Sequence, residues 1–287
     1  MRFFKTPNID FLGKRHFAYV TSLILFISSL LIILLKGPKY GIDFTGGNIA
    51  QIRFERDFPC EIIRKELAKI GMGKAEIQKY GSERNYLIKY SEKIDPDSLI
   101  KIFKKNLKEE VILERAENVG PRVGKELQYK AIEAVLIGMI LMLIYIALRF
   151  NFKFGIAAVL ALFHDVIITL GFLVFLNREI TIPVIAALLT IVGYSINDSI
   201  IVSDRIRENL KKMRGNFFDI ANKSINQTLS RTIITSGTTL IVVLSLLFLG
   251  GPILRDFSLA LTIGIIVGTY SSIYIVASIV NDWERKR

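Results

Sequence analysis

The sequence predicts an α-helical membrane protein: six transmembrane helices with a small ferredoxin-like α+β extracytoplasmic domain between helices 1 and 2. Three observations support this class. The 287 residues are 51% hydrophobic with a mean hydropathy of +0.42, yet the formal net charge is +12. Six apolar runs reach the roughly 20 residues that a bilayer requires. The long segment between the first two runs instead has the residue pattern of a globular α+β domain.

The six apolar runs lie at residues 17–35, 131–148, 155–176, 182–203, 227–249 and 257–280. The first run follows Arg2, Lys5, Lys14 and Arg15, as the core of a secretory signal would. Its core is long, however, and no cleavage site of small residues follows it. We therefore interpret the first run as an uncleaved signal anchor.

Basic residues predict the orientation. Fifteen Lys and Arg residues lie in residues 1–16, 149–154, 204–226 and 281–287, against Arg178 and Arg255 in the two opposite loops. Cytoplasmic loops carry the excess of Lys and Arg, so both termini are expected in the cytoplasm. Residues 204–226 are expected to form a cytoplasmic amphipathic loop, in which 205–212 is helical and lies along the membrane surface.

Residues 36–128 must then face the outside. Alternating apolar and polar residues predict strands at 50–55, 75–80, 86–91 and 110–116, and helical spacing predicts helices at 61–70 and 95–107. This β-α-β-β-α-β order is the ferredoxin-like arrangement. The charged residues of the domain are most simply a solvated face.

Composition excludes several classes of function. One cysteine, Cys60, cannot form an internal disulfide framework or a cysteine-ligated metal cluster. Two histidines, His16 and His164, do not favour a histidine zinc site. No phosphate-binding loop of the Gly-x-x-x-x-Gly-Lys-Ser/Thr type is present. We expect no metal, no cofactor, no nucleic acid and no enzymatic activity.

Ionisable residues within the spans are the candidate site, because each costs about 2.5–3.5 kcal/mol to insert. Asp198 lies about 24 Å from the outer end of span four and Arg231 about 28 Å from that of span five, at 1.5 Å per residue. The two side chains are therefore at similar depth. A proton relay and a static ion pair both fit this spacing, and the sequence leaves the two open.

Other polar residues lie close to this pair along the helices. Tyr194 is one turn before Asp198, and Asn197 directly precedes it. Span five carries a polar stripe at four-residue spacing, which is expected to face protein or water: Gln227, Arg231, Thr235 and Thr239. In span six, Gly264 and Gly268 form a small-residue face for close helix packing.

His164 and Asp165 are secondary candidates. Adjacent residues point about 100° apart on a helix, so the two are expected not to serve one site directly. A packing or hydrogen-bonding role and a role in proton transfer both remain open for them. Ser195 with His164 would be needed for an intramembrane serine protease, and Asp165 with Asp198 for an aspartyl protease. Neither pair lies in a supporting sequence context, so both interpretations are weak.

Longer motifs resemble a known family. Residues 40–47 (YGIDFTGG) resemble the signature of the SecD/SecF protein-export membrane proteins. Further segments, spread over the whole chain, resemble the SecF branch of this family. They are 119–124 (VGPRVG), 161–165 (ALFHD), 193–209 (GYSINDSIIVSDRIREN), 224–236 (SINQTLSRTIITS) and 268–272 (GTYSS). Asn197 stands where the SecD branch would place its aspartate.

The resemblance implies a place within the resistance-nodulation-division superfamily and a location in the bacterial cytoplasmic (inner) membrane. It implies pairing with SecD and action beside the SecYEG channel, with YajC as a further partner, on a translocating unfolded polypeptide and driven by the proton motive force. It assigns the proton relay to Asp198 and Arg231. From their positions along the helices, Asn197 is grouped with this relay, and Tyr194 and Thr235 are secondary candidates. The signature turn is Gly41, Asp43, Gly46 and Gly47, whose glycines would permit tight turns. The alternative is a free-standing proton-coupled small-molecule exporter of related fold.

Overall fold

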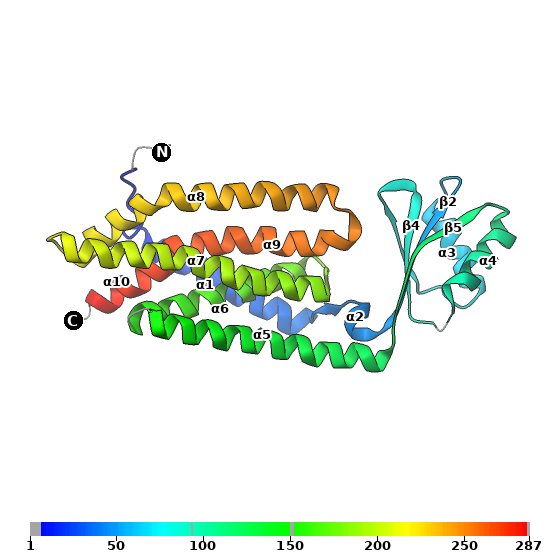
Figure 1. The fold of residues 1–287 in the computed structure, drawn as a ribbon, viewed down its shortest axis with the longest axis horizontal. Helices are drawn as coiled ribbons and strands as arrows, with labels where there is room; N and C mark the ends of the chain where they lie inside the picture. Colours follow the sequence, from blue (N-terminus) through cyan, green and yellow to red (C-terminus); the bar gives the residue numbers. More distant parts are fainter. Residues whose placement is uncertain (1–6, 93, 150–151, 286–287) are drawn as a thin grey trace. The chain divides into compact units, whose positions relative to one another are not determined.

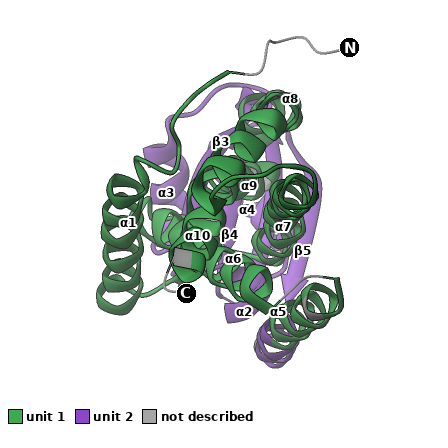
Figure 2. Ribbon diagram, turned by 90° about the vertical axis from the view of Figure 1, so that its left-hand side faces the viewer, with its two compact units in different colours: residues 1–39, 133–287 green, residues 40–132 purple. Residues whose placement is uncertain are grey.

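The computed structural model describes residues 7–285 except 93, 150 and 151. It divides into two compact units (Figure 2). We call Met1–Lys39 with Glu133–Arg287 the helical unit, and Tyr40–Ile132 the α+β unit. Four basic residues of the orientation argument, Arg2, Lys5, Lys286 and Arg287, lie outside the described residues.

Six helices in the described part of the chain are long and apolar enough to cross a membrane. Five of them are α1 (Arg15–Lys36), α5 (Pro121–Arg149), α6 (Phe152–Phe175), α7 (Ile182–Lys212) and α8 (Phe217–Leu249), drawn in Figure 1. The sixth is a composite of α9 (Gly251–Ser271), a π-helical turn η1 (Ser272–Val276) and α10 (Ala277–Arg285). π-Helical turns are rare in proteins, and those that occur often lie at functional sites.

The helix predicted at 205–212 is present, but much of the rest of the loop predicted at 204–226 is helical as well. α7 continues to Lys212, and α8 already begins at Phe217. The apolar helical spacing continues past residue 203, the expected end of the span. Ile206 is buried one turn after Val202, in the same core. The break comes at Gly215, whose positive φ suits glycine, and the Asn216 side chain then caps α8 by accepting from the Asp219 amide.

Helices α6, α7 and α9 form the interior of the helical unit. Each packs against the other two, α1 packs on α6, and α8 packs on α7 and α9. About half or more of each interior span is buried, against 17% or less for α1, α5 and α8. The peripheral helices expose many large apolar residues, as lipid or protein contact requires.

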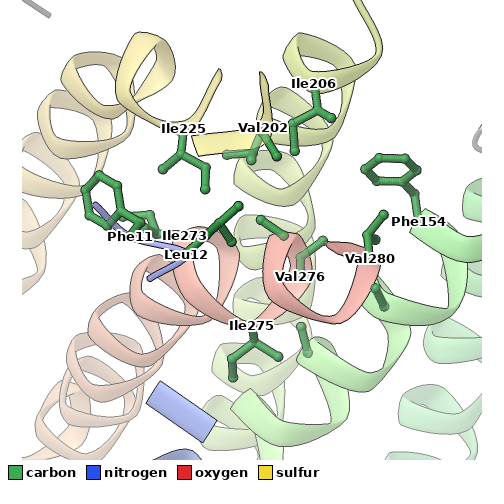
Figure 3. Packing of buried hydrophobic residues seen from close by; sticks show 14 of the residues in the cluster. Phe11, Leu12, Phe154, Val202, Ile206, Ile225, Ile273, Ile275, Val276 and Val280 are labelled. Carbon is green, nitrogen blue, oxygen red and sulfur yellow. The ribbon is translucent and has the colours of Figure 1, made fainter. Parts of the chain in front are cut away.

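One apolar core joins the N-terminal segment to four of these helices (Figure 3). Phe11 and Leu12 insert beside Ile225 of α8 and Ile273 of η1. Further members come from α6, α7 and α10: Phe154, Val202, Ile206 and Val280. The segment before α1 is therefore part of the folded helical unit.

The α+β unit contains a four-stranded antiparallel sheet in the order β3-β4-β2-β5. Its strands are β2 (Gly47–Phe54), β3 (Glu76–Tyr80), β4 (Ser82–Tyr90) and β5 (Val111–Val119). Two helices, α3 (Cys60–Lys69) and α4 (Pro96–Leu107), connect them, and both bury apolar residues against the same sheet face. Two-residue strands, β1 (Lys39–Tyr40) and β6 (Glu179–Ile180), and the short helix α2 (Ile42–Thr45) complete the structure.

The alternation seen in the sequence sets which face of the sheet is buried. Ala50, Ile52 and Phe54 of β2 all point into the core, where they meet Ile63 of α3 and Phe103 of α4. A bulge between Gln51 and Ile52 shifts the register with β5 but leaves this face intact.

Candidate functional site

Asp198 is a buried carboxylate on the interior helix α7. Only 2% of the residue is exposed, and its Oδ2 atom has no hydrogen-bond partner in the described structure. A buried carboxylate without a partner carries a large desolvation penalty, so such groups are rare outside functional sites.

Arg231 of α8 lies close enough to Asp198 to act on it electrostatically. No ion pair within 4.0 Å joins them in the described part of the chain. The Arg231 side chain is exposed, as is Asn197. The structure therefore does not contain the static pair in contact, and it leaves the guanidinium open to a second molecule.

The polar stripe predicted on α8 faces outward from this chain. Arg231 is exposed, and Gln227, Thr235 and Thr239 are half-buried. The Thr235 hydroxyl donates to its own helix, at 3.0 Å from the Arg231 and Thr232 carbonyl oxygens, and not to Asp198. The buried stripe is the one displaced by a single residue: Ser224, Thr228, Thr232 and Ser236.

Hydroxyl groups link helices α7, α8 and α9 near Asp198. Tyr194 donates to Ser236 Oγ at 3.1 Å, and Ser236 Oγ lies 2.8 Å from Thr269 Oγ1. Thr232 is fully buried and its hydroxyl has no partner. Sequence reasoning did not single out Thr232; its signal was the four-residue spacing with Thr228 and Ser236.

Asp165 is a second buried carboxylate in the long apolar helices, with no exposed surface. Its Oδ2 accepts hydrogen bonds from Ser195 Oγ of α7 at 2.6 Å and Ser271 Oγ of α9 at 2.7 Å. Its Oδ1 lies 2.9 Å from His164 Nδ1. The expectation that His164 and Asp165 do not serve one site directly is therefore wrong. Backbone directions diverge by 100°, but two flexible side-chain bonds are enough to bring the groups together.

The protease geometries are not assembled in the described structure. Ser195 donates to Asp165 rather than to His164, so no serine–histidine hydrogen bond exists. Oδ2 of Asp198 has no hydrogen-bond partner, so it does not form the shared-proton contact of an aspartyl dyad with Asp165. The described residues contain no group of three or more His, Cys, Asp or Glu that could hold a metal ion.

Close helix contacts surround Asp165. A Cβ atom on Gly268 would lie 3.0 Å from Ser195 Cβ and 3.6 Å from Asp165 Oδ2. One on Gly264 would lie 2.2 Å from Ile191 Cδ1. Small residues at both positions therefore let α9 approach α7 closely enough for Ser271 to reach Asp165.

The signature turn lies in the α+β unit. Gly41 precedes α2, Asp43 lies in its first turn, and Gly46 and Gly47 follow it with positive φ. Gly124 of α5 packs on this turn: a Cβ there would lie 2.9 Å from the Phe44 carbonyl oxygen and 3.0 Å from the Gly46 nitrogen. Two sequence motifs, 40–47 and 119–124, thus meet in space.

Six long apolar helices in the described chain make this a multi-pass membrane protein. A family model described as "Protein export membrane protein SecD/SecF, C-terminal" matches residues 99–286, and one described as "SecD/SecF GG Motif" matches residues 31–57. The chain therefore belongs to the SecD/SecF family of protein-export membrane proteins.

Individual relatives agree with the family models. The protein translocase subunit SecF of Calditerrivibrio nitroreducens is 47% identical over 95% of this chain and 93% of its own length. The protein translocase subunit SecDF of Thermus thermophilus is 45% identical over 98% of this chain. A crystal structure of Thermus SecDF, described as a translocon-associated membrane protein, superposes with a TM-score of 0.86 at 46% identity over 97% of this chain. The chain spans 39% of the length of that protein.

Proposed function

We propose that the chain acts as a SecF-type subunit that uses the proton motive force to assist protein export through the SecYEG channel. The observation that carries this proposal is the incomplete site at Asp198. A buried carboxylate lacks a partner at Oδ2, and the nearby guanidinium of Arg231 is exposed. Such a site is completed by a second bundle of helices, which in this family is SecD.

The Thermus relative supports the pairing, because there a stretch similar to this chain is part of a single longer SecDF protein. Half-transporter bundles with a binding site at their junction are common among secondary transporters. One proton crossing a potential of 100 mV releases about 2.3 kcal/mol, which is enough to bias a conformational equilibrium. The relay consists of Asp198 and Arg231, with Asn197 beside them on the exposed side of α7.

The same proposal places the chain in the bacterial cytoplasmic membrane with both termini in the cytoplasm. The α+β unit then lies outside and contacts the emerging polypeptide. Its antiparallel order β3-β4-β2-β5, with both helices on one face, supports a ferredoxin-like domain. The role is non-enzymatic, requires no cofactor, and includes YajC among the partners of the complex.

The experiment is proton-dependent export into vesicles carrying the Asp198→Asn variant. We expect the proton-driven stimulation to be lost, while membrane insertion and co-purification with SecD persist. Thr238→Val is the matched control, because Thr238 is exposed on α8 and donates only to its own helix. Undiminished proton-dependent export by Asp198→Asn would refute the relay. Purification of the chain without a second six-span protein would favour the free-standing exporter.

A further inference from the structure

The three-helix junction at Asp165 has features that packing alone does not require. A single oxygen, Asp165 Oδ2, accepts from serines on two other helices, and the other oxygen contacts His164. His164 is 8% exposed, and its ring is stacked on Phe26 of α1 with centroids 6.4 Å apart. Its Nε2 atom is buried and has no partner among the described residues. Buried polar atoms are almost always hydrogen-bonded, so a bare imidazole nitrogen at this place calls for a role.

Charge accounting indicates what the junction binds. In the described chain no Lys or Arg forms an ion pair with Asp165, and its neighbours on α7 and α9 are hydroxyl groups. A carboxylate beside a neutral imidazole would therefore be a net negative charge in the bundle, which is costly. One added proton makes the couple neutral, either as carboxylate with imidazolium or as carboxylic acid with imidazole.

Other titratable groups on the surrounding helices are bonded elsewhere. Tyr19 of α1 donates to Asp282, Tyr194 of α7 donates to Ser236, and Tyr270 of α9 donates to the Ala18 carbonyl oxygen. Lys153, at the start of α6, pairs with Glu284. Asp198 is the remaining ionisable group on the apolar part of α7, three residues beyond Ser195.

Both neutral forms of the couple carry a hydrogen on His164 Nε2. Without the added proton, Nδ1–H donates to Asp165 Oδ1 and the Nε2 lone pair is bare. The proton, taken from water, binds that lone pair and is released by the reverse step. Nε2 is therefore the atom that reports whether the site is loaded.

We propose that the His164–Asp165 couple, with Ser195 and Ser271, is a second buried proton-binding site, distinct from Asp198. Its position gives the proton a mechanical consequence. Ser195 lies one turn before Asp198 on α7, and Ser271 directly precedes the π-helical turn η1. Loading cancels the net negative charge of the couple to which both hydroxyls are bonded, and so changes the strength with which α7 and α9 are held to α6. This use of the proton rests on the proposed function; the binding itself does not.

The test is nitrogen NMR of the full chain labelled with ¹⁵N-histidine. The chain has only two histidines, so in the His16→Gln variant every histidine signal comes from His164. We expect Nε2 to be bare at high pH and to bind a proton as the pH is lowered. In Asp165→Asn the change should be lost or move by at least about tenfold in proton concentration. An Nε2 atom that stays in one state throughout, or titrates unchanged in Asp165→Asn, would overturn the proposal.

Two serine variants provide a second test that holds even if Asp165→Asn misfolds. Ser271→Ala removes one hydroxyl donor and should move the midpoint of Nε2 protonation by about tenfold in proton concentration. Ser258→Ala is the matched control: Ser258 is equally buried on α9, but its hydroxyl has no partner. Equal midpoints in these two variants would also overturn the proposal. Asp198→Asn separates the two claims, because it should abolish proton-driven export and leave the His164 titration in place.

Discussion

Asn226 of α8 holds the backbone of Ile9 from both sides. Its Nδ2 donates to the Ile9 carbonyl oxygen at 2.8 Å, and its Oδ1 accepts from the Ile9 amide at 2.9 Å. Asn222, one turn earlier, adds a second donor to the same carbonyl oxygen at 3.0 Å and accepts from the Phe11 amide at 2.9 Å. The segment before α1 is thereby fixed to the helix that carries Arg231.

Asn226→Ala should detach this segment. Asn226 is 4% exposed and the change removes both bonds to Ile9, so the free energy of unfolding should fall by about 1–3 kcal/mol. Thermal unfolding in detergent measures the loss, and proteolysis near residues 7–12 reports detachment. Lys223→Ala, an exposed change on the same helix turn, is the control. Equal stability of the two variants would show that the Asn226–Ile9 hydrogen bonds do not stabilise the protein.

Arg231→Met should separate stability from function. The side chain is exposed in this chain and makes no ion pair with a described carboxylate, so the isolated chain should change by less than about 0.5 kcal/mol. Proton-dependent export should nevertheless be lost, because the relay loses the cation that acts on Asp198. Arg231→Lys retains the charge and should restore part of the stimulation. Stability and export that decline together in Arg231→Met would point to a structural role instead.

Tyr86 and Asp57 make the α+β unit sensitive to acid. The Lys79 hydrogen bond, followed by that of Tyr86, lowers the pKa of Asp57 below its usual value near 4. A lowered pKa in the folded state means that the stabilisation is present above pH 4 and is lost as the pH falls through the folded value. The protection of residues 47–90 against hydrogen exchange, relative to the intrinsic exchange rate at each pH, should therefore fall below about pH 4 in the full chain. Asp57→Asn should remove this acid dependence, and an unchanged pH profile would contradict the assignment.

Gly124→Ala should disturb the signature turn. The new methyl group would lie 2.9 Å from the Phe44 carbonyl oxygen and 3.0 Å from the Gly46 nitrogen, and both are backbone atoms that cannot rotate away. We expect a loss of about 1–3 kcal/mol, seen as faster hydrogen exchange in residues 40–48. Gly120→Ala is the matched control, since a Cβ at Gly120 meets nothing within 4 Å. Equal exchange in the two variants would show that the turn tolerates the methyl group.

The periodic features were predictable from sequence, and the features that depend on neighbours were not. Alternation along β2 and helical spacing at Ile63 and Leu67 identify elements, because burial of one face imposes those periods. On α8, however, two adjacent polar stripes have the same period. Sequence cannot tell that Thr232 faces this chain while Arg231 faces outward, because that choice depends on the packing of α7 and α9. Likewise Ser271 lies in the 268–272 motif, but the motif does not indicate its partner, and the close approach at Gly268 brings it to Asp165.

Gly264→Ala should force α9 away from α7. The added Cβ would lie 2.2 Å from Cδ1, 2.4 Å from Cγ1 and 2.9 Å from Cγ2 of Ile191, so no single rotation of that side chain relieves the overlap. Ile191 is 1% exposed and has little space to move into. Overpacking of this kind costs about 1–3 kcal/mol, and the shift should also lengthen the Ser271–Asp165 hydrogen bond seven residues along α9.

Gly237→Ala on α8 is the comparison, because a Cβ there meets nothing within 4 Å and alanine favours the helix by roughly 0.5–1 kcal/mol. In thermal unfolding in detergent, the midpoint temperature should therefore fall for Gly264→Ala and rise for Gly237→Ala. If Gly264→Ala were as stable as Gly237→Ala, α9 and α7 would not be held at the distance seen here. The serine contact to Asp165 would then be a loose one. A destabilised Gly264→Ala that regains stability with Ile191→Val would instead locate the strain at this one contact, since the valine gives up the Cδ1 atom that lies closest.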